Sequence, residues 1–272
     1  MKRLLDAHRS GFPDGFTAIT RSDDRDNDTG IGLGVLVLRA GETTQMRPSG
    51  ETAWLLMHGR VRVAVADTQH DLARASLFDE SASCVHVAAG TNVAITALSD
   101  IELTVYDCAN AQPFDTRVFL PADVPNEHRG RGQVQNRSLR FVRTIFDARN
   151  SPAQVELVLG EVVTLPGGWS SYPPHHHAQP EIYHYRFTAP QGYGHAELGE
   201  AVHKVRQNDT ICIPAGLDHA QCAAPGYGMY YSWVIRHLPN NPYTVPEFTA
   251  EHAWTMAPTA EFWWPRGVDD ER

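Results

Sequence analysis

The sequence predicts an all-β protein built from two similar β-barrels in tandem. Short runs rich in Val, Ile, Thr and aromatic residues recur along the chain, and Gly, Pro, Asn and Asp separate them. This spacing is typical of β-sandwiches and barrels, and long stretches of helical periodicity are nearly absent. The length of 272 residues allows one large or two ordinary domains. Because runs of the same character form two successive blocks, we expect two domains.

The first barrel is expected over residues 1–121. Its strand-like runs lie at 34–41, 53–67, 83–90, 92–98 and 101–107. Apolar residues then thin out and Arg and Gly concentrate, so residues 122–150 are interpreted as a linker between the barrels.

The second barrel is expected over residues 151–238. Its strand-like runs lie at 153–165, 181–187, 195–199, 210–216 and 228–235. Residues 239–272 combine five prolines with Trp254, Trp263 and Trp264. Since proline removes donors from a sheet, this segment predicts an irregular arm whose aromatic side chains pack over the barrels.

Charge and cysteine usage limit which partners and which cellular compartment are possible. The net charge is 23 minus 32, or -9, without any Lys/Arg-rich run. This balance disfavours nucleic acid and membranes as partners and leaves a small anionic substrate open. The four cysteines contain no CxxC pair, which favours free thiols in a reducing cytoplasm. No signal peptide or run of about 20 apolar residues is present, so we expect a soluble cytoplasmic protein.

A cluster of candidate metal ligands lies between residues 169 and 187. On an extended strand, His175 and His177 point the same way, and Glu181 shares their odd parity although Pro180 interrupts the run. His219 follows a Pro- and Gly-containing turn at the start of the next strand. Imidazole and carboxylate donors suit Zn, Mn, Fe, Co or Ni. We expect one divalent transition metal, with zinc as the first candidate, and we leave His176 and His184 outside the ligand set.

Two spaced motifs resemble the signature of the cupin barrel. They read His175-x-His177-x3-Glu181 and Pro214-x-Gly216-x2-His219. Further segments resemble the 5-deoxy-glucuronate isomerases of myo-inositol catabolism over residues 34–254. The similar segments are RGRG (129–132), RFVR (140–143), 160–177, EIYHYRF (181–187), PQGYG (190–194), APGYGMYY (224–231) and HAW (252–254).

The resemblance implies a bicupin fold with metal ligands only in the second barrel. It also implies conversion of 5-deoxy-D-glucuronate to 5-dehydro-2-deoxy-D-gluconate. The first barrel agrees with this asymmetry, since it lacks an HxH motif and has Val93 where a ligand would stand. His58 and His86 are therefore interpreted as surface or packing residues. Only three residues separate His177 from Glu181, fewer than is usual in the family, and the segment after Tyr231 also departs from the family pattern.

Aldose–ketose isomerisation needs a Lewis acid and a group that moves a proton. Tyr183 and Tyr185 share the parity of Glu181, so these three residues are the catalytic candidates. A substrate carboxylate should meet a guanidinium, and Arg143 and Arg186 are the candidates for this role.

Two other functions remain open at this point. Two imidazoles and a carboxylate also suit a cupin Fe(II) oxygenase. A sugar-acid-binding cupin with a purely structural metal would carry the same residues. A homo-oligomer is compatible with the sequence as well.

Overall fold

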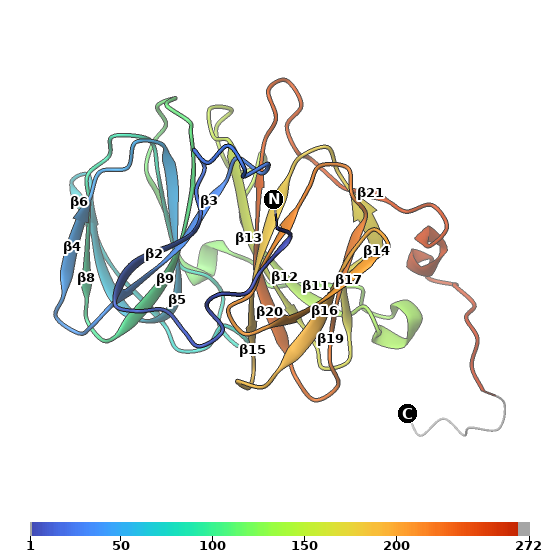
Figure 1. The fold of residues 1–272 in the computed structure, drawn as a ribbon. Coiled ribbons are helices and arrows are strands. Elements are labelled where there is room, and N and C mark those ends of the chain that lie inside the picture. The colour runs from blue at the N-terminus through green and yellow to red at the C-terminus, as the bar shows by residue number, and fades with distance from the viewer. Residues whose placement is uncertain (1, 266–272) are drawn as a thin grey trace.

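Two β-barrels lie side by side in the computed structural model, which describes residues 2–265 (Figure 1). The first barrel is a nine-stranded sheet in which β10, β7, β5, β9, β3 and β2 are successive neighbours, and β4, β6 and β8 complete it through β5. Its strands are β2 (Gly15–Thr20), β3 (Gly32–Leu38), β4 (Thr43–Met46), β5 (Glu51–Val65), β6 (Thr68–Arg74), β7 (Cys84–Val87), β8 (Val93–Ala97), β9 (Ile101–Cys108) and β10 (Arg117–Phe119).

The second barrel consists of two facing sheets, with the strand orders β1-β18-β15-β20-β13-β12-β11 and β17-β16-β19-β14-β21. The strands are β1 (Leu4–Leu5), β11 (Glu127–Arg129), β12 (Arg140–Phe146), β13 (Leu157–Thr164), β14 (Trp169–His176), β15 (Glu181–Phe187), β16 (Tyr193–Leu198), β17 (Ala201–Arg206), β18 (Thr210–Ile213), β19 (His219–Ala223), β20 (Met229–Arg236) and β21 (Glu247–Phe248). Three short 3₁₀ helices complete the described residues: η1 (Pro121–Asp123), η2 (Gln133–Asn136) and η3 (Ala253–Met256).

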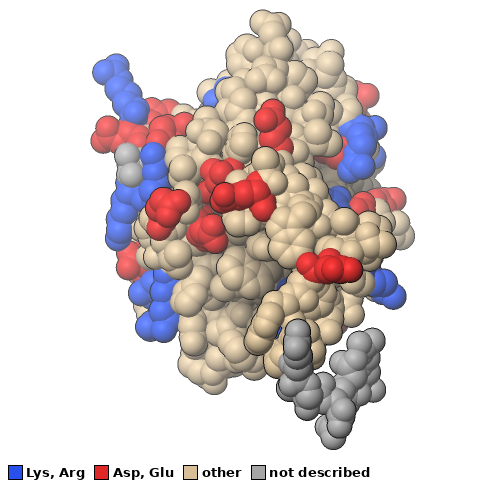
Figure 2. All heavy atoms as spheres, turned by 90° about the vertical axis from the view of Figure 1, so that its right-hand side faces the viewer, with Lys and Arg blue, Asp and Glu red and all other residues tan. Residues whose placement is uncertain are grey.

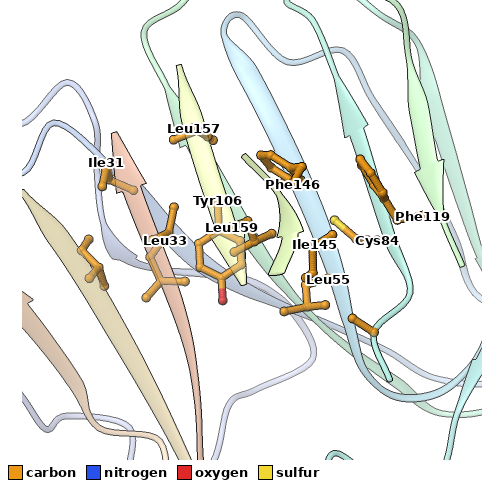
Figure 3. Close-up of a cluster of buried hydrophobic side chains, with 14 of the residues drawn as sticks. Ile31, Leu33, Leu55, Cys84, Tyr106, Phe119, Ile145, Phe146, Leu157 and Leu159 are labelled. Atoms are coloured by element: carbon orange, nitrogen blue, oxygen red, sulfur yellow. The ribbon is translucent and has the colours of Figure 1, made fainter. Parts of the chain in front are cut away.

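The predicted tandem-barrel architecture is confirmed, and each predicted strand-like run contains a strand. The chain places three apolar cores in a row: one inside each barrel and one between them. Figure 3 shows the middle core, where Leu33, Leu55 and Cys84 of the first barrel meet Ile145 and Leu159 of the second. Strand β13 is therefore buried on both faces, which explains why its sequence is almost continuously apolar instead of alternating.

The boundaries of the second barrel differ from the prediction. The segment taken as a linker contains β11 and β12, and β12 pairs antiparallel with β13 inside the seven-stranded sheet. Strand β1 also belongs to this sheet, where it pairs with β18. The sequence analysis missed these strands, because β12 joins the sheet through β13 and β1 joins it through β18, and neither segment has a strongly apolar pattern of its own.

The C-terminal arm returns to the open end of the second barrel. Strand β21 pairs with β14, and the backbone N–H and hydroxyl of Thr249 both donate to the carbonyl of Pro174. The expected packing of the tryptophans over the barrels is wrong, since Trp254, Trp263 and Trp264 are 50%, 83% and 42% exposed. No helix in the described part of the chain is long and apolar enough to span a bilayer.

Candidate metal centre

The two sequence motifs meet at one end of the second barrel. His175 lies near the end of β14 directly opposite His219, the first residue of β19. The turn before His219 contains Gly216 at φ +73°, a conformation that glycine adopts without strain. Glu181 begins β15, the next strand along the chain, which belongs to the facing seven-stranded sheet. Two local motifs thus become neighbours through strand pairing.

His177, Glu181 and His219 form a buried group that can hold a metal ion. One potential ligand atom from each lies within 4.8 Å of the other two. All three side chains are nearly inaccessible, with exposed fractions of 7%, 3% and 0%. His175 stays outside this group, although its ring centroid lies 4.4 Å from that of His219. Three of the four predicted ligands are therefore brought together, and the fourth is their neighbour.

Each imidazole is oriented by a backbone carbonyl. The Nδ1 atoms of His177 and His219 lie 2.7 Å and 3.0 Å from the carbonyl oxygens of Gln179 and Leu217. An Nδ1–H that donates to a carbonyl leaves Nε2 as the free lone pair, which is the usual arrangement around protein-bound metals. The two Nε2 atoms lie 3.2 Å and 3.3 Å from the same oxygen of Glu181.

The residues fit a divalent transition metal. His219 Nε2 is buried without a hydrogen-bond partner, since its approach to Glu181 lacks hydrogen-bond geometry. An unpaired buried nitrogen costs free energy, and a bound cation would remove that cost. Two imidazoles and a carboxylate are the donor set of many such sites.

The protonation states also suit metal binding. Burial alone would raise the pKa of Glu181, but the close approach of the His177 and His219 rings to its carboxylate lowers it to about 2. Burial and the neighbouring His219 lower the pKa of His175 to about 3. At neutral pH the group therefore presents a carboxylate, and His175 is a neutral imidazole.

A cavity of about 280 Å³ opens onto these residues. Tyr183 and Tyr231 form part of its wall, and their rings stack with centroids 4.5 Å apart. Ser171 Oγ lies 3.1 Å from each of the two phenolic oxygens. Burial and the charge of Glu181 hold the pKa of Tyr183 well above its usual value. The wall therefore carries three linked, protonated hydroxyl groups.

Tyr185 is a weaker catalytic candidate than the sequence indicated. Its hydroxyl donates to Gln221 Oε1 at 2.6 Å, and it is not among the residues that line the cavity. Its odd parity does place it inside the barrel, but deeper in the apolar core than Tyr183.

The arm supplies two aromatic residues to the cavity. The ring of Tyr243 lies 5.0 Å from that of His177, and Phe248 lies 5.9 Å from His175. Neither residue was found from the sequence, because nothing local links residues 243–248 to the ligand motifs. The prolines and the strand β21 pairing are what hold this segment over the site.

Arg143 and Arg186 do not reach the cavity, which corrects the prediction that they bind substrate. Arg143 is 1% exposed and donates to Glu161 Oε1 at 2.9 Å, within a buried group between the barrels that also contains Arg74 and Tyr230. Arg186 pairs with Glu102 of the first barrel at 2.5 Å. Both side chains lie on the face of the seven-stranded sheet that packs against the first barrel, and not on the face that lines the cavity.

The cavity instead contains three other arginines, Arg129, Arg140 and Arg149. On β12, Arg140, Val142 and Thr144 all line the cavity, whereas Arg143 points the opposite way. Had residues 140–146 been assigned to a strand, the alternation of side chains would have placed Arg140 and Arg143 on opposite faces of the sheet. Interpreting the segment as a linker removed that signal.

The remaining histidines behave as packing or surface residues. His86 is buried and stacks on Phe146 with centroids 4.1 Å apart, and His58 is exposed. His176 contacts Asp218 outside the ligand group, and His184 is buried beside Thr210.

Sequence comparisons place the chain in a known group of proteins. A family model described as "KduI/IolB family" matches residues 4–255. A protein from Geobacillus kaustophilus named 5-deoxy-glucuronate isomerase is 28% identical over 247 residues, which cover 83% of this chain and 86% of the relative. A protein of the same name from Shouchella clausii is 28% identical over 220 residues, covering 73% and 78%.

Solved structures agree with the fold. An IolB-like protein from Salmonella typhimurium is 25% identical and superposes with a TM-score of 0.81, covering 94% of this chain and 100% of that chain. Oxalate decarboxylase from Lactobacillus farciminis, a bicupin, superposes with a TM-score of 0.65 at 13% identity, covering 91% and 88%. The latter likeness concerns the bicupin fold alone.

Proposed function

Because the chain belongs to the KduI/IolB family, we propose that it is a metal-dependent sugar-acid isomerase that converts 5-deoxy-D-glucuronate to 5-dehydro-2-deoxy-D-gluconate in myo-inositol catabolism. The observation that carries this proposal is the buried group of His177, Glu181 and His219 at a cavity walled by hydroxyl groups. Relatives named 5-deoxy-glucuronate isomerase support the reaction class.

His177, Glu181 and His219 would hold the metal, with His175 as the adjacent fourth candidate. A divalent ion bound there supplies a Lewis acid for a carbonyl and its neighbouring hydroxyl. Zinc is our first candidate, and Mn, Fe, Co and Ni suit the same donors. The carbonyl-oriented imidazoles keep the site in the form that binds a cation.

The reaction moves one proton from C2 to C1 and one from O2 to O1, so that C1 is reduced as C2 is oxidised. Tyr183 is the residue of this chain best placed to hold and pass such a proton, since it lines the cavity and remains a donor at neutral pH. Ser171 and Tyr231 extend it into a chain of hydroxyl groups.

We also propose a cytoplasmic location. All four cysteines are free thiols, and Cys84, Cys108 and Cys212 are fully buried, as is typical of proteins from a reducing compartment.

The test is incubation of metal-loaded protein with 5-deoxy-D-glucuronate, followed by NMR for the ketose. The wild type should convert the substrate without consuming oxygen. His177→Ala should lose bound metal and lower turnover by at least about 100-fold, since a Lewis acid contributes several kcal/mol. Pro48→Ala is the control. Pro48 corresponds to His177, because it follows Met46 by two residues and Met46 pairs with Val93 as His175 pairs with His219.

A His177→Ala protein that kept both metal and turnover would contradict the site. Oxygen uptake that depends on Fe(II) would favour an oxygenase instead. Metal-loaded protein that binds the sugar acid but never produces the ketose would indicate a binding protein.

A further inference from the structure

Arg140 stands apart from the other charged groups of the cavity. It lies at the start of β12 on the face that carries Val142 and Thr144, and these three side chains form one side of the cavity. The opposite sides carry the ligand residues and the two stacked tyrosines. A guanidinium is therefore present in the same space as the candidate metal centre.

The charge of Arg140 is not matched by an acid. Arg129 pairs with Glu127 and Arg149 pairs with Asp147, each at 2.8 Å or less. Over residues 2–265, by contrast, no carboxylate oxygen lies within 4.0 Å of Arg140, and its recorded hydrogen bond goes to the carbonyl of Ser138 at 2.9 Å. Burial and the proximity of Arg129 lower the pKa of Arg140, which reflects a poorly solvated positive charge.

Strand pairing adds a second cation. Arg129 on β11 is the direct cross-strand partner of Arg140 on β12. Like charges directly opposite each other on a sheet are destabilising. Since both arginines line the cavity, an anion bound there would relieve this repulsion.

The backbone around Arg140 is shaped to admit its side chain. Gly130, the residue after Arg129, has φ +77°, and a Cβ there would lie 2.8 Å from Arg140 Nη1 and 2.3 Å from the Ser138 carbonyl oxygen. Only glycine leaves room for this close approach. Gly130 of the RGRG segment thus leaves the space that the guanidinium of Arg140 occupies.

We propose that Arg140, assisted by Arg129, binds the carboxylate of the substrate and makes the cavity selective for sugar acids over neutral sugars. This rests on the proposed function in that a sugar acid is taken as the substrate. A guanidinium can pair with a carboxylate through two parallel hydrogen bonds. Holding that end of a six-carbon chain at β12 leaves the aldehyde end for the histidines and Tyr183.

The protein as a whole is negatively charged, so its net charge does not attract an anionic substrate. The chain has a net charge of -9. In the view of Figure 2, acidic side chains lie across the middle of the face, and Lys and Arg lie mainly toward its edges. Against this net negative charge, the arginines inside the cavity supply a local positive potential for an anionic substrate.

The experiment compares two ligands and four proteins. Calorimetry measures the Kd of metal-loaded protein for 5-deoxy-D-glucuronate and for 5-deoxy-D-glucose, in which a hydroxymethyl group replaces the carboxylate. We expect the wild type to prefer the acid and Arg140→Gln to bind the acid about 10- to 100-fold more weakly, with little change for the neutral sugar. Arg140→Lys should recover part of the loss, and the exposed Arg25→Gln is the charge-matched control.

Kinetics and a second variant separate binding from folding. In Arg140→Gln the KM for the acid should rise with a smaller change in kcat, and metal content should stay at the wild-type level. Gly130→Ala should weaken acid binding in the same direction, because it displaces a guanidinium that is still present. Equal Kd values of wild type and Arg140→Gln for the acid would overturn the inference, as would equal affinity of the wild type for the two ligands.

Failure of the proposed function gives a different result. A wild-type protein that prefers the acid, loses that preference in Arg140→Gln and yet makes no ketose would refute the isomerase proposal and support the carboxylate anchor. A wild type that isomerises the acid, with an unchanged KM in Arg140→Gln, would support the isomerase proposal and refute the anchor.

Discussion

The two barrels share their strand pairing but differ at the positions that matter for chemistry. In the second barrel His175 pairs with His219 across β14 and β19, and in the first barrel Met46 pairs with Val93 across β4 and β8. Ile213, the cross-strand partner of Glu181, lies six residues before His219, and Val87, the partner of Thr52, lies six residues before Val93. Continuing the register, the positions of His175, His177, Glu181 and His219 correspond to Met46, Pro48, Thr52 and Val93.

The interiors differ in the same way. Tyr183 and Tyr231 line a cavity in the second barrel. Their counterparts in the first barrel, by register, are Trp54 and Leu103, which are 2% and 1% exposed in a closed apolar core. One barrel fills its centre with hydrocarbon, and the other leaves room for hydroxyl groups and a ligand.

The first barrel also has a buried glutamate, Glu51, but it lies one residue away from the position that corresponds to the candidate ligand Glu181. Glu51 also begins a strand, but it stands one position before Thr52, the counterpart of Glu181, and so points to the other face of the sheet. There it pairs with His86 at 2.9 Å and accepts backbone N–H groups of the second barrel. The first barrel therefore uses its buried His–Glu pair to join the two barrels.

The largest effects should separate the two interiors. Trp54→Ala should lower the free energy of unfolding by about 3–5 kcal/mol, because it opens a large void in a closed core. Tyr183→Phe should cost only about 1 kcal/mol in stability, but should lower kcat by roughly 10² to 10⁴, because it removes the proton-transfer hydroxyl. Urea unfolding and steady-state kinetics measure the two quantities.

The contrast between the interiors would be broken by either of two results. One is a Trp54→Ala protein that still folds but binds no metal. The other is a Tyr183→Phe protein with the kcat of the wild type.

Removal of the metal should destabilise the second barrel selectively. At a free metal concentration 100 times Kd, binding stabilises the folded state by about 2.7 kcal/mol, and a chelator should remove this contribution. Hydrogen exchange should then quicken at the amides of β14 and β19 while those of β4 and β8 stay protected. His177→Ala is the control, since the chelator should leave its stability unchanged, and equal loss of protection in both barrels would contradict the expected selectivity.

The smallest effect is a pH dependence of the metal-free protein. The pKa of His175 lies at about 3 in the folded state and near 6.5 when the chain is unfolded, so between these values only the unfolded state takes up the proton. Stability from this residue is therefore complete above pH 6.5 and falls as the pH is lowered, by at most about 1.4 kcal/mol per pH unit. His175→Met, which introduces the residue of the first barrel, should reduce the slope of unfolding free energy between pH 6.5 and 5.5.

An identical pH slope in the wild type and in His175→Met would show that other groups account for the acid sensitivity. His184, whose pKa burial and Arg186 hold well below its usual value, acts with the same sign, as does His237, whose pKa burial also lowers.

Much of this architecture could be predicted from local patterns. Strands such as β5 and β15 are predicted by their β-branched and aromatic residues, and the number of barrels follows from the repetition of such runs. The candidate ligand residues were predictable because His177, which directly follows β14, and Glu181, which begins β15, are only four residues apart, and a short turn leads into His219. Family membership, implied by the same motifs, is confirmed.

Other features depend on partners that are distant along the chain. Strand β12 has a sequence compatible with a linker, and only its pairing with β13 decides that Arg140 enters the cavity while Arg143 joins the barrels. Strand β1 and the arm residues Tyr243 and Phe248 join the second barrel through contacts over more than 65 residues.

By itself, then, the sequence determined the two-barrel fold, the barrel that carries the candidate metal site and the three residues grouped there, because hydrophobic alternation and turn spacing act over a few residues. Only the tertiary structure decided which arginines face the cavity, which tyrosine accompanies Tyr183 and what covers the site. The physical reason is that the face to which a strand residue points depends on register, and register is set by the neighbouring strands.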